Sequence, residues 1–121
     1  PHKIIMGGPM MGIAGVSLDI PVVKGTSGLL LFSEKYAHNE QELNCIRCGR
    51  CADACPMTLY PAMVDSAIKH SGVEALKDLN VNYCMECGSC SYVCPAKRPL
   101  TQTMRLAKAT LRKEKSKWLR I

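Results

Sequence analysis

All eight cysteines of this sequence lie in two short stretches. CIRCGRCADACP, residues 45–56, and CMECGSCSYVCP, residues 84–95, have the same cysteine spacing, shifted by 39 positions. Each stretch reads C-x2-C-x2-C-x3-C-P, and the two share four Cys, one Gly and one Pro. This spacing is typical of a loop that binds a [4Fe–4S] cluster through thiolates. The chemistry that it indicates is electron transfer.

The residues between the cysteines also suit such a loop. Three thiolates spaced by two residues can wrap one corner of a cluster, while backbone N–H groups turn toward its sulfides and offset its negative charge. Gly49 and Gly88 follow the second cysteine of each run, where a tight loop benefits from an unrestricted φ angle. The proline after the fourth cysteine fixes the direction of the chain and has no N–H to leave unpaired.

We predict two [4Fe–4S] clusters as cofactors, with crossed ligands, because the fourth cysteine of each run ligates the other cluster in two-cluster proteins. Cluster one would be bound by Cys45, Cys48, Cys51 and Cys94, and cluster two by Cys84, Cys87, Cys90 and Cys55. The crossing would tie distant parts of the chain together and bring the clusters near each other. With every cysteine engaged and no nucleophile–base pair in the sequence, we expect no catalytic residue in this chain.

Two other interpretations of the cysteines, as zinc ligands or as disulfides, have weaker support in the sequence. Two C-x-x-C pairs make a structural zinc site, so eight cysteines are enough for two such sites. Zinc does not explain the third and fourth cysteines at fixed offsets. Disulfides are disfavoured because no secretory signal is visible, so we expect reduced thiols. His2, His38 and His70 lie outside both runs, and we expect them to be surface or packing residues.

The formal net charge of +6 is concentrated near the C-terminus. Residues 1–96 carry seven Lys and Arg against nine Asp and Glu, whereas residues 97–121 carry nine against one. Such a run is most often a solvated face, and anionic lipid headgroups or an acidic protein partner are the alternatives. Apart from Trp118, nothing aromatic is interleaved with these charges, so we expect no nucleic-acid binding. The longest apolar stretch, residues 28–32, is far shorter than the ~20 residues of a membrane-spanning helix.

Charge also differs between the two cysteine runs. Arg47 and Arg50 lie in the first, and the matching positions of the second are Glu86 and Ser89. Positive charge favours the reduced, more negative cluster, so we predict a higher reduction potential for cluster one. Solvent screening should keep the difference modest, and Asp53 partly offsets it.

Helices are predicted around the runs from hydrophobic periodicity. One begins at Pro61 and ends near Gly72, a second covers residues 73–79, and Pro99 opens a final basic helix. The apolar stripe of the first would consist of Tyr60, Met63, Val64, Ala67 and Ile68. The stripe of the last would consist of Leu100, Met104, Ala107, Leu111 and Trp118.

Residues 1–43 are rich in glycine and β-branched residues instead. DIPVV, residues 19–23, and LLLF, residues 29–32, are predicted to pair as a hairpin around a loop at residues 24–28. GGPMMG, residues 7–12, matches no phosphate-binding pattern and is predicted to be a turn.

The sequence resembles the C subunit of the Rnf electron-transport complex. The blocks that carry the resemblance are GGPMMG, PVVKGTSGLL, CIRCGRCADACPM and CMECGSCSYVCPAKRPL, followed by the basic helix. The resemblance implies an α+β fold: the end of a β-grasp-like (SLBB) domain over residues 1–40, and a mainly α-helical, ferredoxin-like dicluster domain over residues 41–121. The start at Pro1 leads us to expect a piece of a longer protein.

The resemblance also implies a parent protein that binds flavin (FMN) and NADH upstream of Pro1, within an ion-translocating ferredoxin:NAD oxidoreductase. Its partners would be other subunits of a membrane redox complex and an electron donor or acceptor such as ferredoxin. It would lie peripherally on the cytoplasmic side of the inner membrane, where the basic helix is suited to contact lipid. A cobalamin reductase shares the architecture. A dicluster protein of the succinate dehydrogenase or heterodisulfide reductase type would leave GGPMMG and KGTSG unexplained.

Overall fold

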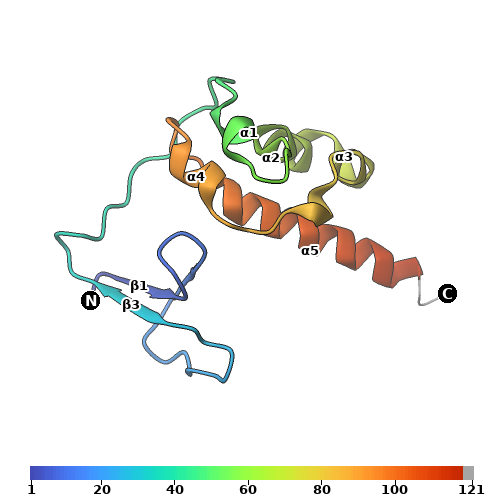
Figure 1. Cartoon of the computed structure of the whole chain (residues 1–121). Helices are drawn as coiled ribbons and strands as arrows, with labels where there is room; N and C mark the ends of the chain where they lie inside the picture. The colour runs from blue at the N-terminus through green and yellow to red at the C-terminus, as the bar shows by residue number, and fades with distance from the viewer. Residues whose placement is uncertain (119–121) are drawn as a thin grey trace. The chain divides into compact units, whose positions relative to one another are not determined.

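The structure is a computed structural model of the 121-residue chain and describes residues 1–118, without the side chain of Trp118. Its internal contacts divide the chain into two compact units, Pro1–Gln41 and Glu42–Ile121. The first unit contains the strands and the second contains the helices (Figure 1). The α+β fold class predicted from the sequence is confirmed.

The first unit is a small antiparallel sheet with the strand order β2-β1-β3. Its strands are β1 (Lys3–Met6), β2 (Ile13–Ala14) and β3 (Leu29–Phe32). In the central strand, Ile5 pairs with Ala14 on one side and with Leu30 on the other, and it is buried with 9% of its surface exposed. GGPMMG forms the turn between β1 and β2, as predicted, and the Gly12 N–H donates to the Gly8 carbonyl at 2.8 Å.

The predicted hairpin of residues 19–23 with residues 29–32 is wrong in one strand. LLLF forms β3, but its partner is β1 (Figure 1), and residues 19–23 are not a strand. Pro21 has no N–H to donate to a ladder. Val23 closes a local turn instead: its carbonyl accepts from the Thr26 N–H at 2.9 Å, and its own N–H donates to Thr26 Oγ1 at 3.2 Å. The backbone N–H and carbonyl of Val23 are therefore used within the loop.

The second unit is helical. It consists of α1 (Arg50–Ala54), α2 (Pro61–His70), α3 (Gly72–Asp78), the 3-10 helix η1 (Val81–Tyr83), α4 (Ser89–Val93) and α5 (Leu100–Trp118). The long helix α5 contacts α2, α3, α4 and η1, and α1 packs on α4 (Figure 1). Pro61 is the first residue of α2, as predicted. Among residues 1–118 no helix has the length and apolar character that crossing a membrane requires.

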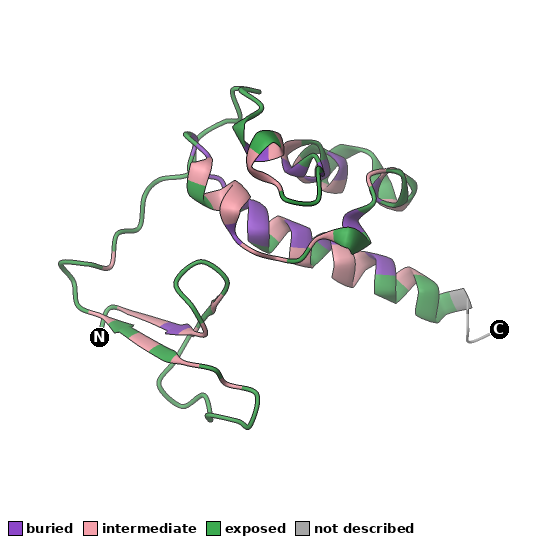
Figure 2. Cartoon of the chain, in the orientation of Figure 1, coloured by how far each residue is buried: buried purple, intermediate pink, exposed green. Residues whose placement is uncertain are grey.

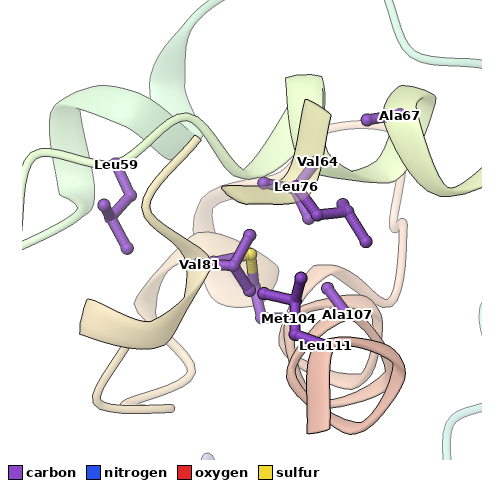
Figure 3. Packing of buried hydrophobic residues seen from close by; sticks show 8 residues of the cluster. All are labelled: Leu59, Val64, Ala67, Leu76, Val81, Met104, Ala107 and Leu111. Atoms are coloured by element: carbon purple, nitrogen blue, oxygen red, sulfur yellow. The ribbon is translucent and has the colours of Figure 1, made fainter. Parts of the chain in front are cut away.

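The core of this unit lies between α5 and the helices α2 and α3. It consists of Leu59, Val64, Ala67, Leu76, Val81, Met104, Ala107 and Leu111 (Figure 3). Buried positions recur along one side of α5 (Figure 2), which confirms the predicted stripe from Leu100 to Leu111. Trp118, the last predicted member, has a side chain outside the described part of the chain.

The predicted stripe of α2 is only partly right. Val64 and Ala67 are buried against α5, but Tyr60 and Met63 are each 56% exposed. Both line an open hollow rather than the core. α2 ends at His70, and Gly72 begins α3 with a φ of +76°, so α3 follows α2 almost directly. The helix predicted over residues 73–79 is confirmed with its bounds shifted by one residue.

Candidate metal centres

The two cysteine runs fold in the same way. Each leads into a five-residue helix, α1 in the first run and α4 in the second. The residue before each helix is a glycine in the left-handed region, Gly49 with a φ of 77° and Gly88 with a φ of 85°. A side chain at either position would strain the backbone. The predicted need for glycine after the second cysteine is confirmed.

A second shared feature turns a backbone amide toward a cysteine sulfur. Arg47 and Glu86 also have positive φ angles, 55° and 57°. The Arg47 N–H donates to Cys45 Sγ at 3.4 Å, and the Glu86 N–H donates to Cys84 Sγ at 3.3 Å. Hydrogen bonds of this kind offset negative charge on a thiolate, which is what a thiolate-bound iron–sulfur cluster requires of its loop. The backbone of both runs therefore fits the cluster that the sequence predicts.

The cysteines surround two separate pockets. Both pockets are small, with a cavity volume of about 30 Å³ in the first and about 20 Å³ in the second. The first is lined by Cys45, Cys48, Cys51 and Cys94, and the second by Cys84, Cys87, Cys90 and Cys55. Each pocket thus receives three cysteines from one run and the fourth from the other, across the packed pair α1 and α4. This grouping is what crossed ligation needs, and the ligation itself stays a prediction.

No group of three or more His, Cys, Asp or Glu side chains within residues 1–118 is arranged to hold a metal ion. A four-iron cluster binds each thiolate through a different iron, so its ligands surround a volume and do not meet at one point. The three histidines line neither cysteine pocket, and all three are exposed. Their predicted role as surface residues is confirmed.

The two pockets differ in their access to solvent. In the first, Cys45 and Cys48 are exposed, whereas Cys51 and Cys94 are buried. In the second, all four cysteines are half-buried. Apolar side chains also line both pockets, such as Ala62 in the first and Met104 in the second. A cluster in the first pocket would therefore have two of its ligands at the surface.

In the second pocket, hydroxyl groups lie beside two of the cysteines. Ser89 Oγ is 3.4 Å from Cys87 Sγ, and this hydrogen bond is the main cause that lowers the pKa of Cys87. Burial raises the pKa of Cys90, against the opposing effect of Thr101, whose Oγ1 lies 3.8 Å from the sulfur. The Ser91 and Thr101 hydroxyls are 2.8 Å apart. Sequence reasoning missed these contacts, and the only signal for Ser89 was its place inside the run.

The acidic residue of the second run is paired with the basic helix. Glu86 Oε1 lies 3.5 Å from Arg105 Nε, and Oε2 lies 4.0 Å from Lys108 Nζ. Lys108 Nζ also donates to the Cys84 carbonyl. Two residues of α5 thus offset the negative charge of Glu86. The charge contrast between the two runs is smaller than the sequence alone suggests.

The arginines of the first run lie in different places. Arg47 lines the first pocket together with Asp65 and Arg98, two residues that the sequence analysis did not single out. Arg50 lines a separate surface hollow with Asp53, which belongs to the same helix. Of the two, Arg47 is the arginine placed to act on a cluster in the first pocket.

Comparison with known proteins agrees with this arrangement. A family profile described as a 4Fe-4S dicluster domain matches residues 37–95. The chain is 42% identical over 108 residues to the C subunit of the Na(+)-translocating ferredoxin:NAD(+) oxidoreductase complex of Acetobacterium woodii, and this match covers 89% of the chain. It is 38% identical over 117 residues to the C subunit of the ion-translocating oxidoreductase complex of Rhodobacter capsulatus, a match that covers 97% of it.

A third relative is more similar over a shorter stretch. The C subunit of the proton-translocating ferredoxin:NAD(+) oxidoreductase complex of Clostridium ljungdahlii is 55% identical over 64 residues, or 53% of this chain. The chain spans only 14%, 24% and 22% of the length of the Clostridium, Acetobacterium and Rhodobacter proteins, respectively. The resemblance read from the sequence is confirmed: the chain belongs to the family of C subunits of ion-translocating oxidoreductase complexes, and it contains a 4Fe-4S dicluster domain.

Proposed function

We propose that this chain passes electrons through two [4Fe–4S] clusters, as part of the C subunit of an ion-translocating ferredoxin:NAD(+) oxidoreductase. One observation carries the proposal. Each of two pockets is lined by four cysteines, three from one run and the fourth from the other. The names of the relatives support the wider assignment, since two of them are subunits of ferredoxin:NAD(+) oxidoreductase complexes.

The residues of the chain have three tasks in this function. The thiolates would hold the clusters, and the Arg47 and Glu86 amides would stabilise the charge on Cys45 and Cys84. The packing of α1 on α4 would keep the two sites close together. When bound, the clusters supply reversible one-electron redox chemistry. No side chain needs to transfer a proton or form a bond to a substrate.

The remaining parts of the proposal concern the parent protein. The first unit, Pro1–Gln41, would be the end of a β-grasp-like domain, and the sites for FMN and NADH would lie upstream of it. Ferredoxin would be an electron partner, and the parent would sit peripherally on the cytoplasmic side of the membrane. These assignments rest on the family, because the chain spans about a quarter or less of its matched relatives.

Anaerobic reconstitution tests the proposed function directly. We expect about eight irons and eight sulfides per chain, which is four of each for two clusters. We also expect a broad visible absorption that bleaches on addition of dithionite. Stoichiometric zinc without a chromophore, in protein prepared anaerobically, would contradict the proposal.

A further inference from the structure

A buried ion pair lies against the first cysteine pocket. Arg98 is 8% exposed, and its Nε donates to Asp65 Oδ2 at 2.9 Å. Its Nη2 lies 2.7 Å from the same oxygen, and the Asp65 side chain is 13% exposed. Both residues line the pocket together with its four cysteines. A largely buried charged pair therefore lies beside the cluster site.

In the other half of the repeat, the positions that correspond to this pair hold apolar residues, and only one of them, Met104, lines the second pocket. The repeat shift of 39 residues takes Arg98 to Leu59 and Asp65 to Met104. Leu59 is 6% exposed and Met104 is 1% exposed, and both belong to the hydrophobic core. A buried ion pair is often no more stabilising than well-packed apolar residues of similar volume. The fold therefore does not require an ion pair at these positions in the other half of the repeat. This points to a role other than stability for the Arg98–Asp65 pair.

Arg98 also fixes the chain where it leads into the first run. Its Nη1 donates to the Leu43 carbonyl at 3.0 Å, and its Nη2 lies 3.1 Å from Glu42 Oε1. The Leu43 N–H in turn donates to the Ala96 carbonyl at 2.9 Å. The segment just before Cys45 is thus tied to the loop just after Cys94. These two cysteines are the first and the last of the proposed ligands of cluster one.

The positive charge of Arg98 is retained despite its burial. Burial opposes the positive charge of Arg98, but the hydrogen bond and charge of Asp65, with the charge of Glu42, outweigh it and raise the pKa of Arg98. Lys69 lies 3.7 Å from Asp65 as well, but its side chain is 51% exposed and its charge is screened by solvent. Removing Asp65 would leave Arg98 with the half-exposed Glu42 as its close acidic partner. Removing Arg98 would leave Asp65 with the exposed Lys69 and the Thr103 hydroxyl, which donates to Oδ1 at 3.4 Å. Either change would therefore weaken the compensation of the remaining charge next to the pocket.

We propose that the Arg98–Asp65 pair sets the reduction potential of the cluster bound by the first cysteine run. The inference rests on the proposed function, because it requires a cluster in the first pocket. Without the guanidinium, the Asp65 carboxylate disfavours the more negative reduced cluster, so the potential falls. Without the carboxylate, the guanidinium favours the reduced cluster, so the potential rises. Cluster two is unaffected in both cases.

The test is an anaerobic redox titration of the cluster-loaded protein, with each cluster followed by EPR. The variants are Arg98→Gln, Asp65→Asn and the double variant, which keeps a polar pair without charge. Lys77→Gln is the matched control, because it removes a positive charge from an exposed pair with Glu74 and Lys77 lines neither cysteine pocket. We expect Arg98→Gln to lower the potential of cluster one and Asp65→Asn to raise it. The double variant should return close to wild type, and Lys77→Gln should change nothing.

Opposite shifts separate tuning of the potential from a merely structural role. A structural pair would lose cluster one in both variants, or shift its potential in the same direction in both, and either result would overturn the inference. Potentials that stay at the wild-type value in all variants would overturn it too. If Arg98→Gln does not retain cluster one, Asp65→Asn and the double variant still show in which direction the pair shifts the reduction potential of cluster one. Wild-type protein without iron and sulfide would refute the proposed function, whereas loaded clusters with unmoved potentials refute only this inference.

Discussion

At the scale of single residues, small polar contacts distinguish cysteines that the sequence presents as equivalent. Ser89 lies inside the second run, and its hydroxyl contacts Cys87 Sγ at 3.4 Å. The matching residue of the first run, Arg50, lines a hollow away from both cysteine pockets. The repeat predicts the position of each cysteine, but it does not predict which neighbour contacts the sulfur, because that depends on the side chains that differ between the copies.

Replacing Ser89 by alanine should make cluster two more sensitive to acid. Cysteine binds iron as the thiolate, and the Ser89 hydrogen bond lowers the pKa of Cys87. Without the hydroxyl that pKa rises, so protons compete for the sulfur at a higher pH. Loss of the visible absorption during acidification should then begin at a higher pH than in wild type. Ser66→Ala, an exposed serine of α2, is the control, and an unchanged acid profile of Ser89→Ala would contradict this reasoning.

The two arginines of the first run should differ in their effect on cluster one. Arg47→Gln removes a positive charge that lines the first pocket, so the potential of cluster one should fall. The shift should be modest, because the Arg47 residue is exposed and screened by solvent. Arg50→Gln should have the smaller effect, since Arg50 lines another hollow with Asp53. The measurement is a redox titration of both variants. If Arg50→Gln shifts the potential of cluster one as much as Arg47→Gln does, the position of Arg47 in the lining of the first pocket is not what determines the shift.

At the scale of elements, α5 serves both the core and the second pocket. Its predicted apolar stripe packs against α2 and α3, so this face is not available to a membrane. Arg105 and Lys108 pair with Glu86 beside the second pocket. A charge reversal at Lys108 would therefore disturb the second cluster site. For this reason Lys108 is not suited to testing whether the basic face of α5 binds lipid or a protein partner. The exposed basic residues nearer the end of the helix are Arg112, Lys113, Lys115 and Lys117.

If the end of α5 contacts anionic lipid, the interaction must be electrostatic. The loaded protein should sediment with vesicles that contain phosphatidylserine, and moderate salt should release it. Each basic residue near such a surface contributes about 1 kcal/mol, so changing Arg112, Lys113 and Lys115 to Gln should weaken binding roughly a hundredfold. Vesicles of phosphatidylcholine alone, and the Lys77→Gln variant, are the controls. Equal binding by wild type and the triple variant would leave the basic end of α5 as a solubilising face.

Elements differed in how well the sequence predicted them. The stripe of α5 was clear because four buried residues repeat with helical spacing. The prediction of a strand at residues 19–23 was wrong because the apolar residues next to Pro21 resemble a strand locally, while the N–H and carbonyl of Val23 bond to Thr26 within the loop. The predicted burial of Tyr60 and Met63 was wrong because an apolar side chain near the start of a helix can equally well line an open hollow. In both failures the deciding contacts lie outside the periodic pattern.

At the scale of the whole chain, the internal repeat is what organises the helical unit. Two copies of one cysteine run, each containing a short helix, pack together through α1 and α4 and produce two pockets. The grouping of cysteines around these pockets was predictable from the spacing. The Arg98–Asp65 pair was not, because it joins residues 33 positions apart and breaks the symmetry of the repeat. The repeat predicts what the two sites share, and the structure reveals how they differ.

The central claim is that each cluster takes three ligands from one run and the fourth from the other. EPR spectra of the reduced Cys55→Ser, Cys87→Ser, Cys94→Ser and Cys48→Ser variants test it most directly. Cys55→Ser should perturb the same cluster signal as Cys87→Ser, because both residues line the second pocket. Cys94→Ser should perturb the same signal as Cys48→Ser, since both line the first. If Cys55→Ser instead perturbs the signal that Cys48→Ser perturbs, each run binds its own cluster and the crossed arrangement is wrong.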